Sequence, residues 1–210
     1  MIRPYDQLFN WPNLLTIVRI LVIPLLVIFF YLPTSWAHLL ASIFFAVAAL
    51  TDWLDGYLAR YLKQSTKLGA FLDPVADKLI VSIALVLIVA EPIFHQVPIF
   101  SATITLPAAL ITIPAAIIVA REIIVSALRE WMAEIGKRSS VSVSTLAKFK
   151  TAVQMLALIV LLYCDQKTPL SLILLGCFLL YTAAVLTIWS MCIYLKAAWQ
   201  ELASVDASLL

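Results

Sequence analysis

Residues 51–79 read TDWLDGYLARYLKQSTKLGAFLDPVADKL and place four carboxylates, at positions 52, 55, 73 and 77, between two apolar segments. Long apolar segments recur along the rest of the chain. Of the 210 residues, 64% are hydrophobic and 12% are charged, whereas soluble domains are about half apolar and about a quarter charged. This composition excludes an ordinary soluble protein. We expect a single membrane domain over residues 1–210, with no separate soluble module.

The apolar segments predict the fold. A bilayer core about 30 Å thick requires about 20 apolar residues per helix, and six segments approach that length. They are residues 14–31, 38–58, 74–90, 106–128, 146–163 and 170–195. The predicted fold class is therefore all-α, a polytopic membrane protein with six transmembrane helices. Residues 1–10 are a candidate for a short helix along the membrane interface, and residues 60–72 and 129–145 are predicted to be loops.

The basic residues predict the orientation of these helices. Most of them fall on the side that holds the N-terminus and the loops 60–72 and 129–145, whereas the opposite loops carry only Lys167. Because cytoplasmic loops carry an excess of Lys and Arg, we expect both termini and the Asp-rich stretch to face the cytoplasm.

The four carboxylates predict a metal site. Asp52 and Asp55 are three residues apart and share a face of the second predicted helix, and Asp73 and Asp77 are four apart on the third. Each charge costs about 2.5–3.5 kcal/mol at the membrane centre, so a cationic partner is expected. Magnesium or manganese suits a cluster that offers only carboxylate oxygens.

Each aspartate also has a purely structural interpretation. Asp73 precedes Pro74 and could be a helix N-cap with proline at the first helical position. Asp77 could complement the dipole of the same helix from its first turn. Asp52 could pair with a lysine. All four together at the membrane boundary favour the metal site.

Small residues beside the carboxylates indicate a space for a ligand. Gly56 directly follows Asp55 within a predicted helix, where glycine costs about 1 kcal/mol relative to alanine. Ala59 lies about one turn further on, and Arg60 follows at the helix end. A nucleotide diphosphate would fit such a site, because the carboxylates can bind a metal, the small residues leave space for the ligand and the cation can contact a phosphate.

The pattern Asp52-x-x-Asp55-Gly56-x-x-Ala59-Arg60, then eight residues, then Gly69-x-x-x-Asp73-x-x-x-Asp77, resembles the signature of the CDP-alcohol phosphotransferase family. All eight signature positions match with the correct spacing, and the predicted number of helices agrees. The resemblance implies two divalent ions, Mg²⁺ or Mn²⁺, on the first three aspartates, with the fourth also touching one ion. It further implies Asp77 as the general base and a homodimer. The implied CDP-lipid site is lined by Gly56, Ala59, Arg60 and Gly69.

Members of this family differ in the alcohol that accepts the phosphatidyl group. Arg121 lies within the fourth predicted helix, and Arg129, Lys148 and Lys150 follow it. These cations could clamp the phosphate of an anionic acceptor, or they could only contact lipid headgroups on the cytoplasmic side. Residues 10–19 and 121–140 resemble the bacterial branch that uses sn-glycerol 3-phosphate.

That branch resemblance also concerns the first helix. Asn13 and Thr16 are candidates to hold the cytidine end of CDP-diacylglycerol. Arg19 has two interpretations, since it could reach the active site or have a structural role.

The expected reaction transfers the phosphatidyl group from CDP-diacylglycerol to sn-glycerol 3-phosphate and releases CMP. It takes place at the cytoplasmic side of a bacterial inner membrane, among membrane lipids and without a nucleic-acid partner. His38 and His95 lie on the opposite side, so we expect direct displacement without a covalent intermediate. Alternatives are a family member that uses inositol phosphate or serine, an intramembrane prenyltransferase and, from another class, a cation transporter.

Overall fold

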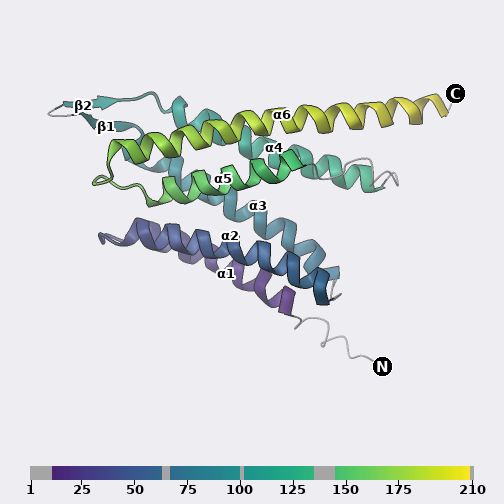
Figure 1. Cartoon of the computed structure of the whole chain (residues 1–210), viewed down its shortest axis with the longest axis horizontal. Helices are drawn as coiled ribbons and strands as arrows, with labels where there is room; N and C mark the ends of the chain where they lie inside the picture. The colour runs from purple at the N-terminus through teal and green to yellow at the C-terminus, as the bar shows by residue number, and fades with distance from the viewer. Residues whose placement is uncertain (1–10, 63–66, 100–101, 135–144, 209–210) are drawn as a thin grey trace.

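Six long helices and one short hairpin form the described part of the chain (Figure 1). The structure is a computed structural model that describes residues 11–62, 67–99, 102–134 and 145–208. The helices are α1 (Trp11–Phe30), α2 (Ala37–Leu62), α3 (Lys67–Ala90), α4 (Ala109–Glu134), α5 (Thr145–Tyr163) and α6 (Leu170–Ser208). The all-α prediction is confirmed for these elements.

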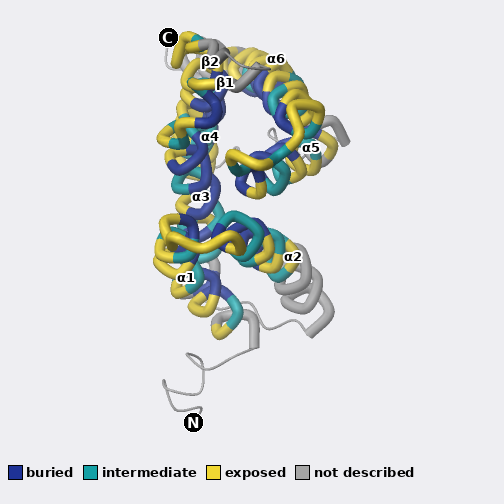
Figure 2. The backbone as a smooth tube through the Cα atoms, turned by 90° about the vertical axis from the view of Figure 1, so that its left-hand side faces the viewer, coloured by how far each residue is buried: buried dark blue, intermediate teal, exposed yellow. Residues whose placement is uncertain are grey.

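The helices form two groups that meet at α3. Viewed end-on, α1 and α2 lie together on one side, and α4, α5 and α6 lie on the other (Figure 2). Helix α3 packs against α1, α4 and α5, and α2 also contacts α5. Apolar residues such as Ile80, Ala84 and Ile88 are buried along α3 and belong to one continuous core. Helix α1 begins and α6 ends at the same end of the molecule, as the predicted topology requires (Figure 1).

The predicted loop 60–72 is helical at every residue that the structure describes, and the predicted loop 129–145 begins inside a helix. Helix α2 continues to Leu62 and α3 already begins at Lys67, so residues 63–66 alone separate them. Pro74 lies inside α3 instead of opening it. Proline is tolerated inside apolar helices because neighbouring groups satisfy the backbone that it leaves unpaired. The N-cap interpretation of Asp73 is therefore wrong, as is the first-turn interpretation of Asp77. Helix α4 likewise reaches Glu134, so Arg129 is helical.

A short hairpin between α3 and α4 was not predicted. After the single 3-10 turn η1 (Pro92–Phe94), strand β1 (Gln96–Ile99) pairs antiparallel with β2 (Ala102–Thr105). Proline inside a segment usually marks a loop or an edge strand, and Pro98 made this segment resemble a loop. The hairpin lies at the end of the molecule opposite to the α2–α3 connection (Figure 1).

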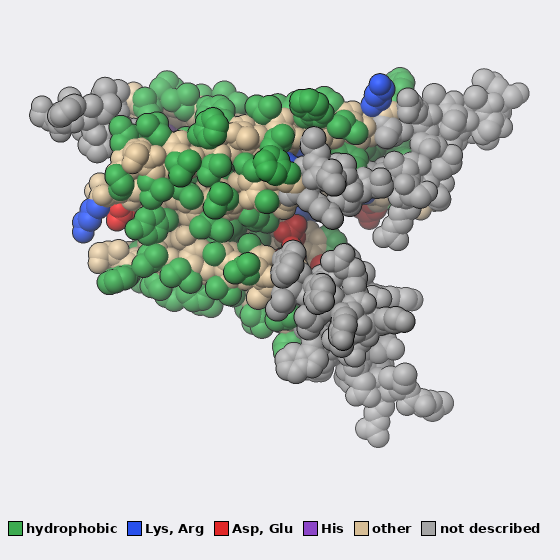
Figure 3. Space-filling model, viewed as in Figure 1, with side chains coloured by type: hydrophobic (Ala, Val, Ile, Leu, Met, Phe, Trp, Pro, Cys, Tyr) green, Lys and Arg blue, Asp and Glu red, His purple; other side chains and the backbone are tan. Residues whose placement is uncertain are grey.

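Polar and apolar side chains are distributed as in a membrane protein. Arg19, Lys150 and Gln154 are at most 2% exposed, whereas Phe71, Phe178 and many other large apolar side chains are exposed. Apolar side chains also dominate the described surface of the face shown in Figure 3. Helix α4 and the Leu170–Lys196 part of α6 are long and apolar enough to cross a bilayer. These observations support membrane association.

Gly176 allows α5 and α6 to pack closely. A Cβ atom at this position would lie 2.6 Å from Leu161 Cδ2 and 3.2 Å from Val160 Cγ1. Leu161 is buried in the core, so it has little room to move. We expect Gly176→Val to lower the free energy of unfolding by about 1–3 kcal/mol, the usual cost of overpacking, measured as a lower melting temperature in detergent.

Two further variants test this packing. Leu175→Val changes an exposed neighbour on the same helix, so its melting temperature should stay close to that of the wild type. Leu161→Ala opens space beside Gly176, and its cost should be less than additive with that of Gly176→Val. A Gly176→Val protein as stable as the wild type would contradict the close packing.

Candidate functional site

Helix α1 holds one carboxylate from each of the two helices that carry the signature. Arg19 Nη1 donates to Asp52 Oδ1 of α2 over 2.6 Å, and the Thr16 hydroxyl donates to Asp73 of α3. Thr16 and Arg19 are three residues apart on one face of α1, and both are almost completely buried. Helix α1 therefore brings the two carboxylates together, although α2 and α3 contact each other less than each contacts α1.

Asp77 lies one turn after Asp73 on the same face of α3. Its carboxyl group interacts electrostatically with Asp52 on α2, Arg19 on α1 and Glu122 on α4. Asp77 is thus close to the charges of both helix groups. This position suits a group that takes a proton from a ligand bound between the two helix groups.

The donor chemistry of these residues fits a hard divalent cation. Asp52, Asp73 and Asp77 offer only carboxylate oxygens, which Mg²⁺ and Mn²⁺ prefer. Among the described residues, no three acidic, His or Cys side chains form a group close enough to hold an ion. The side chain of Asp55 lies outside the described part, so the complete set of four carboxylates stays a prediction.

A second charged cluster joins α4, α5 and α6. Glu122 Oε1 accepts hydrogen bonds from Lys150 Nζ at 2.8 Å and from Arg121 Nη1 at 3.2 Å. Arg121 Nη2 also donates to Ser190 Oγ at 3.2 Å, and Arg129 Nη2 donates to the Tyr194 hydroxyl at 3.3 Å. Within the described hydrogen-bonded cluster, three cations therefore accompany one carboxylate. The excess positive charge suits an anionic ligand.

The acidic and basic clusters are neighbours. Lys78, next to Asp77, donates to the hydroxyl of Ser126 on α4, and Ser126 lies one turn after Glu122. Asp77 also interacts electrostatically with Lys150. A metal-bound phosphate and an anionic acceptor could therefore bind side by side at this place.

The remaining predicted site residues are only partly described. Gly69 is buried in the first turn of α3. The side chains of the others lie outside the described part of the chain, namely Asn13 of α1, Gly56, Ala59 and Arg60 of α2, and Lys148 of α5. Because α2 is continuous over residues 52–60, positions 52, 55, 56 and 59 follow one side of the helix.

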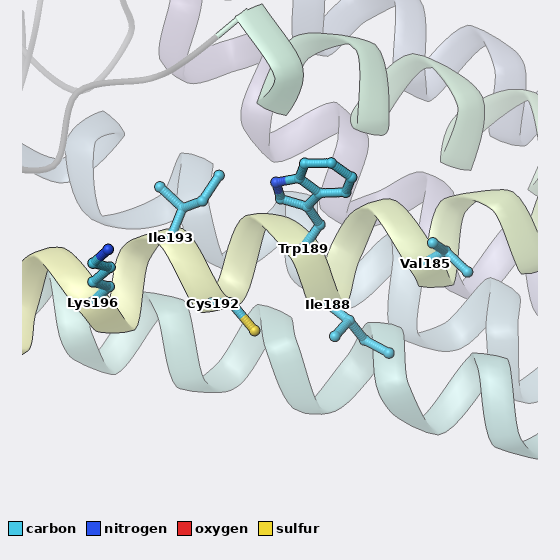
Figure 4. A pocket seen from close by; sticks show the side chains of 6 residues that line it. All are labelled: Val185, Ile188, Trp189, Cys192, Ile193 and Lys196. Carbon is cyan, nitrogen blue, oxygen red and sulfur yellow. The ribbon is translucent and has the colours of Figure 1, made fainter.

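A surface hollow of about 490 Å³ lies along α6, away from the predicted carboxylates. Its lining is Val185, Ile188, Trp189, Cys192, Ile193 and Lys196 (Figure 4). Lys196 is the one charged side chain among these six. None of these six residues is a carboxylate or belongs to either charged cluster, so we do not assign the chemistry to the hollow.

Comparison with known families decides the identity of the fold. The sequence profile of the family described as CDP-alcohol phosphatidyltransferase matches residues 9–189. The chain belongs to this family. Both charged clusters lie within the matched residues, apart from Ser190 and Tyr194, which follow the end of the match. The resemblance read from the aspartate signature is confirmed at the level of the family.

Individual relatives within the CDP-alcohol phosphatidyltransferase family are similar over almost their whole length. A protein of Pectobacterium atrosepticum is 55% identical over 194 residues, which cover 92% of this chain and 97% of that protein. Proteins of Salmonella choleraesuis and Shigella flexneri serotype 5b are 51% identical with the same coverage. All three are named CDP-diacylglycerol–glycerol-3-phosphate 3-phosphatidyltransferase.

The family signature did not identify two of the polar residues that complete the basic cluster. Ser190 and Tyr194 lie one turn apart near the C-terminal end of a predicted apolar helix. Polar groups in such a helix usually face the interior of a bundle, so their spacing could have identified them. Arg19 was considered, and the structure assigns it to Asp52.

Proposed function

We propose that this chain transfers the phosphatidyl group from CDP-diacylglycerol to sn-glycerol 3-phosphate, giving phosphatidylglycerol phosphate and CMP. The observation that carries the proposal is the identity of about half of all residues with enzymes named for this reaction, over nearly the full length of both chains. The two adjacent clusters support it. Carboxylates on α2 and α3 suit a metal-bound diphosphate, and cations on α4 and α5 suit an acceptor phosphate.

Metal ligands in this proposal are Asp52, Asp55 and Asp73, with Asp77 contributing to one of two ions. Bound Mg²⁺ or Mn²⁺ would neutralise the diphosphate and stabilise the attacking and leaving oxygens. Arg19 and Thr16 hold two of these carboxylates in place. The CDP moiety lies along Gly56, Ala59, Arg60 and Gly69, near Asn13 and Thr16.

The proposed chemistry is one direct displacement. Asp77 takes the proton from the 1-hydroxyl of glycerol 3-phosphate, and that oxygen attacks the phosphorus that carries diacylglycerol. The bond from this phosphorus to the bridging oxygen breaks, and CMP leaves with the electron pair. The clamp for the acceptor phosphate consists of Arg121, Arg129, Lys148 and Lys150. The protein contributes mainly orientation and preorganised charge.

Formation of lipid product by the purified protein tests this function. With CDP-diacylglycerol and Mg²⁺, we expect CMP release that depends on glycerol 3-phosphate and stops after chelation of divalent ions. Inositol phosphate and serine serve as competing acceptors. Faster turnover with either one would replace the proposed acceptor, and the absence of CMP release with every acceptor would favour a transporter.

The Thr16–Asp73 hydrogen bond makes a prediction about the metal. A residue that orients a metal ligand typically contributes about 10–100-fold to metal affinity or activity. We expect Thr16→Val to raise the Mg²⁺ concentration for half-maximal activity about tenfold. Thr16→Ser keeps the hydroxyl and should restore the wild-type curve. If the dependence of activity on Mg²⁺ concentration is unchanged in Thr16→Val, Thr16 does not orient a metal ligand.

The proposed location is the bacterial inner membrane, with six transmembrane helices, the reaction centre facing the cytoplasm and a homodimeric assembly. Buried polar side chains and exposed large apolar side chains support the membrane placement. Labelling of whole cells tests the orientation, because Lys167→Cys should react with an impermeant thiol reagent and Lys196→Cys should not. Mass measurement of the detergent-solubilised protein tests the dimer.

A further inference from the structure

Two neutral residues of α6 hold two arginines of α4 at one place. Ser190 and Tyr194 are one turn apart on α6, and both are at most 5% exposed. Arg121 lies 5.8 Å from the centre of the Tyr194 ring, and Arg129 lies 5.5 Å from it. Hydrogen bonds to the Ser190 and Tyr194 hydroxyls complete the arrangement. The two guanidinium groups therefore converge on a single aromatic ring.

The contacts to α6 leave the positive charge of these arginines intact. Two guanidinium groups that share a ring repel each other, and cation–π contacts together with hydroxyl acceptors offset that repulsion. Neither a phenol nor a serine hydroxyl neutralises a cation. Among the described residues, Glu122 is the one carboxylate that forms an ion pair with these cations, and Arg121 shares it with Lys150. The described contacts thus keep positive charge available for an anion.

Arg121 also retains an unused donor. Its Nε atom is buried and has no hydrogen-bond partner among the described residues. A buried donor without a partner is costly, and a guanidinium group with a remaining N–H is suited to a phosphate or carboxylate. This unpaired donor independently indicates that the cluster binds an anionic ligand.

We infer that Ser190 and Tyr194 are positioning residues, which orient Arg121 and Arg129 to bind the phosphate monoester of the acceptor. The inference rests on the proposed function and adds residues of α6 to it. Both substrates contain phosphate, so the diphosphate of the donor is the other source of the same chemistry. The acceptor is favoured because the cluster lies on α4, α5 and α6, whereas the carboxylates suited to a metal-bound diphosphate lie on α2 and α3.

Steady-state kinetics of α6 variants test the inference. We expect Tyr194→Leu to raise the KM for glycerol 3-phosphate about tenfold, because the ring and its hydroxyl are both lost. Tyr194→Phe keeps the ring and Ser190→Ala keeps the tyrosine, so each should have a smaller effect of about threefold. The KM for CDP-diacylglycerol and the inhibition constant of CDP should stay within about twofold of the wild-type values. Tyr194→Trp keeps an aromatic face and should recover most of the affinity for the acceptor.

Tyr181 provides the matched control on the same helix. Its hydroxyl donates to the Leu110 carbonyl at 2.8 Å, away from both arginines. Tyr181→Leu and Tyr181→Phe should leave both KM values unchanged. An unchanged KM for glycerol 3-phosphate in Tyr194→Leu, or an equal rise for both substrates, would overturn the inference. A selective rise in the inhibition constant of CDP would assign the arginines to the donor and would also overturn it.

Two measurements separate a failure of this inference from a folding defect of a variant and from a failure of the proposed function. If Tyr194→Leu does not fold, the milder Tyr194→Phe and Ser190→Ala variants decide, since a combined variant should multiply their effects on the acceptor KM. If the wild-type protein forms no lipid product from CDP-diacylglycerol and glycerol 3-phosphate, the proposed function fails. Thermal stabilisation by glycerol 3-phosphate in the wild type, and its loss in the α6 variants, would still support the phosphate site.

Discussion

The Asp77→Asn variant should lose phosphatidyl transfer almost completely. A positioned general base contributes about 10²–10⁴-fold to a reaction rate, and asparagine cannot accept the proton. Asparagine has nearly the same shape, so we expect CDP-diacylglycerol to bind with measurable affinity. Turnover is measured as CMP release at saturating concentrations of both substrates, and donor affinity is measured by binding of labelled CDP-diacylglycerol.

The position of Asp77 makes this expectation specific. Its carboxyl group interacts with charges on α1, α2 and α4, so it lies between the proposed donor and acceptor sites. Asp165→Asn is a matched control, because Asp165 lies in the loop between α5 and α6 and accepts hydrogen bonds from Lys167 and Thr168 of the same loop. Near-normal turnover in Asp77→Asn would remove this residue as the base.

The second large effect is expected for Arg121→Ala. A hydrogen bond to a charged group contributes about 1.5–3 kcal/mol, and Arg121 is a buried cation of the proposed acceptor clamp. We expect the KM for glycerol 3-phosphate to rise about 100-fold, with a change of less than about threefold for CDP-diacylglycerol. The measurement is a full kinetic analysis in which each substrate is varied in turn.

Two further variants provide comparisons for that result. Arg121→Lys keeps the charge but not the planar fork, so its KM should lie between the wild-type and alanine values. Lys196→Ala removes an exposed cation from α6 and should change neither KM. Equal increases in both KM values for Arg121→Ala would contradict the assignment to the acceptor pocket.

Helical periodicity and hydropathy predict most of this fold but not its polar interruptions. Pro24 and Pro114 lie within long apolar segments and were included in the predicted helices, which the structure confirms. Pro74 follows Asp73, and the pair resembled the start of a helix. Packing of α3 against its neighbours maintains the helix through both residues. Local sequence alone does not contain that information.

The aspartate signature predicts which residues belong to the site but not what holds them. Thr16 and Asp73 are 57 residues apart, and Arg121 and Ser190 are 69 residues apart. Periodicity tells which face of a helix carries a polar residue, yet it does not tell which other helix lies opposite. The pairing of Arg19 with Asp52 was therefore not predicted, although both residues were noticed.

The ion pair between the buried Arg19 and the partly exposed Asp52 has a consequence for biogenesis. The chain is translated 33 residues beyond Arg19 before Asp52 is made, which takes roughly 2–7 s at about 5–20 residues per second. During that interval an arginine in the middle of α1 would face lipid alone, at a cost of about 2.5–3.5 kcal/mol. We expect the nascent α1 to be retained at the translocon until α2 has been synthesised. The two helices would then partition into lipid together, as a helical hairpin without net charge.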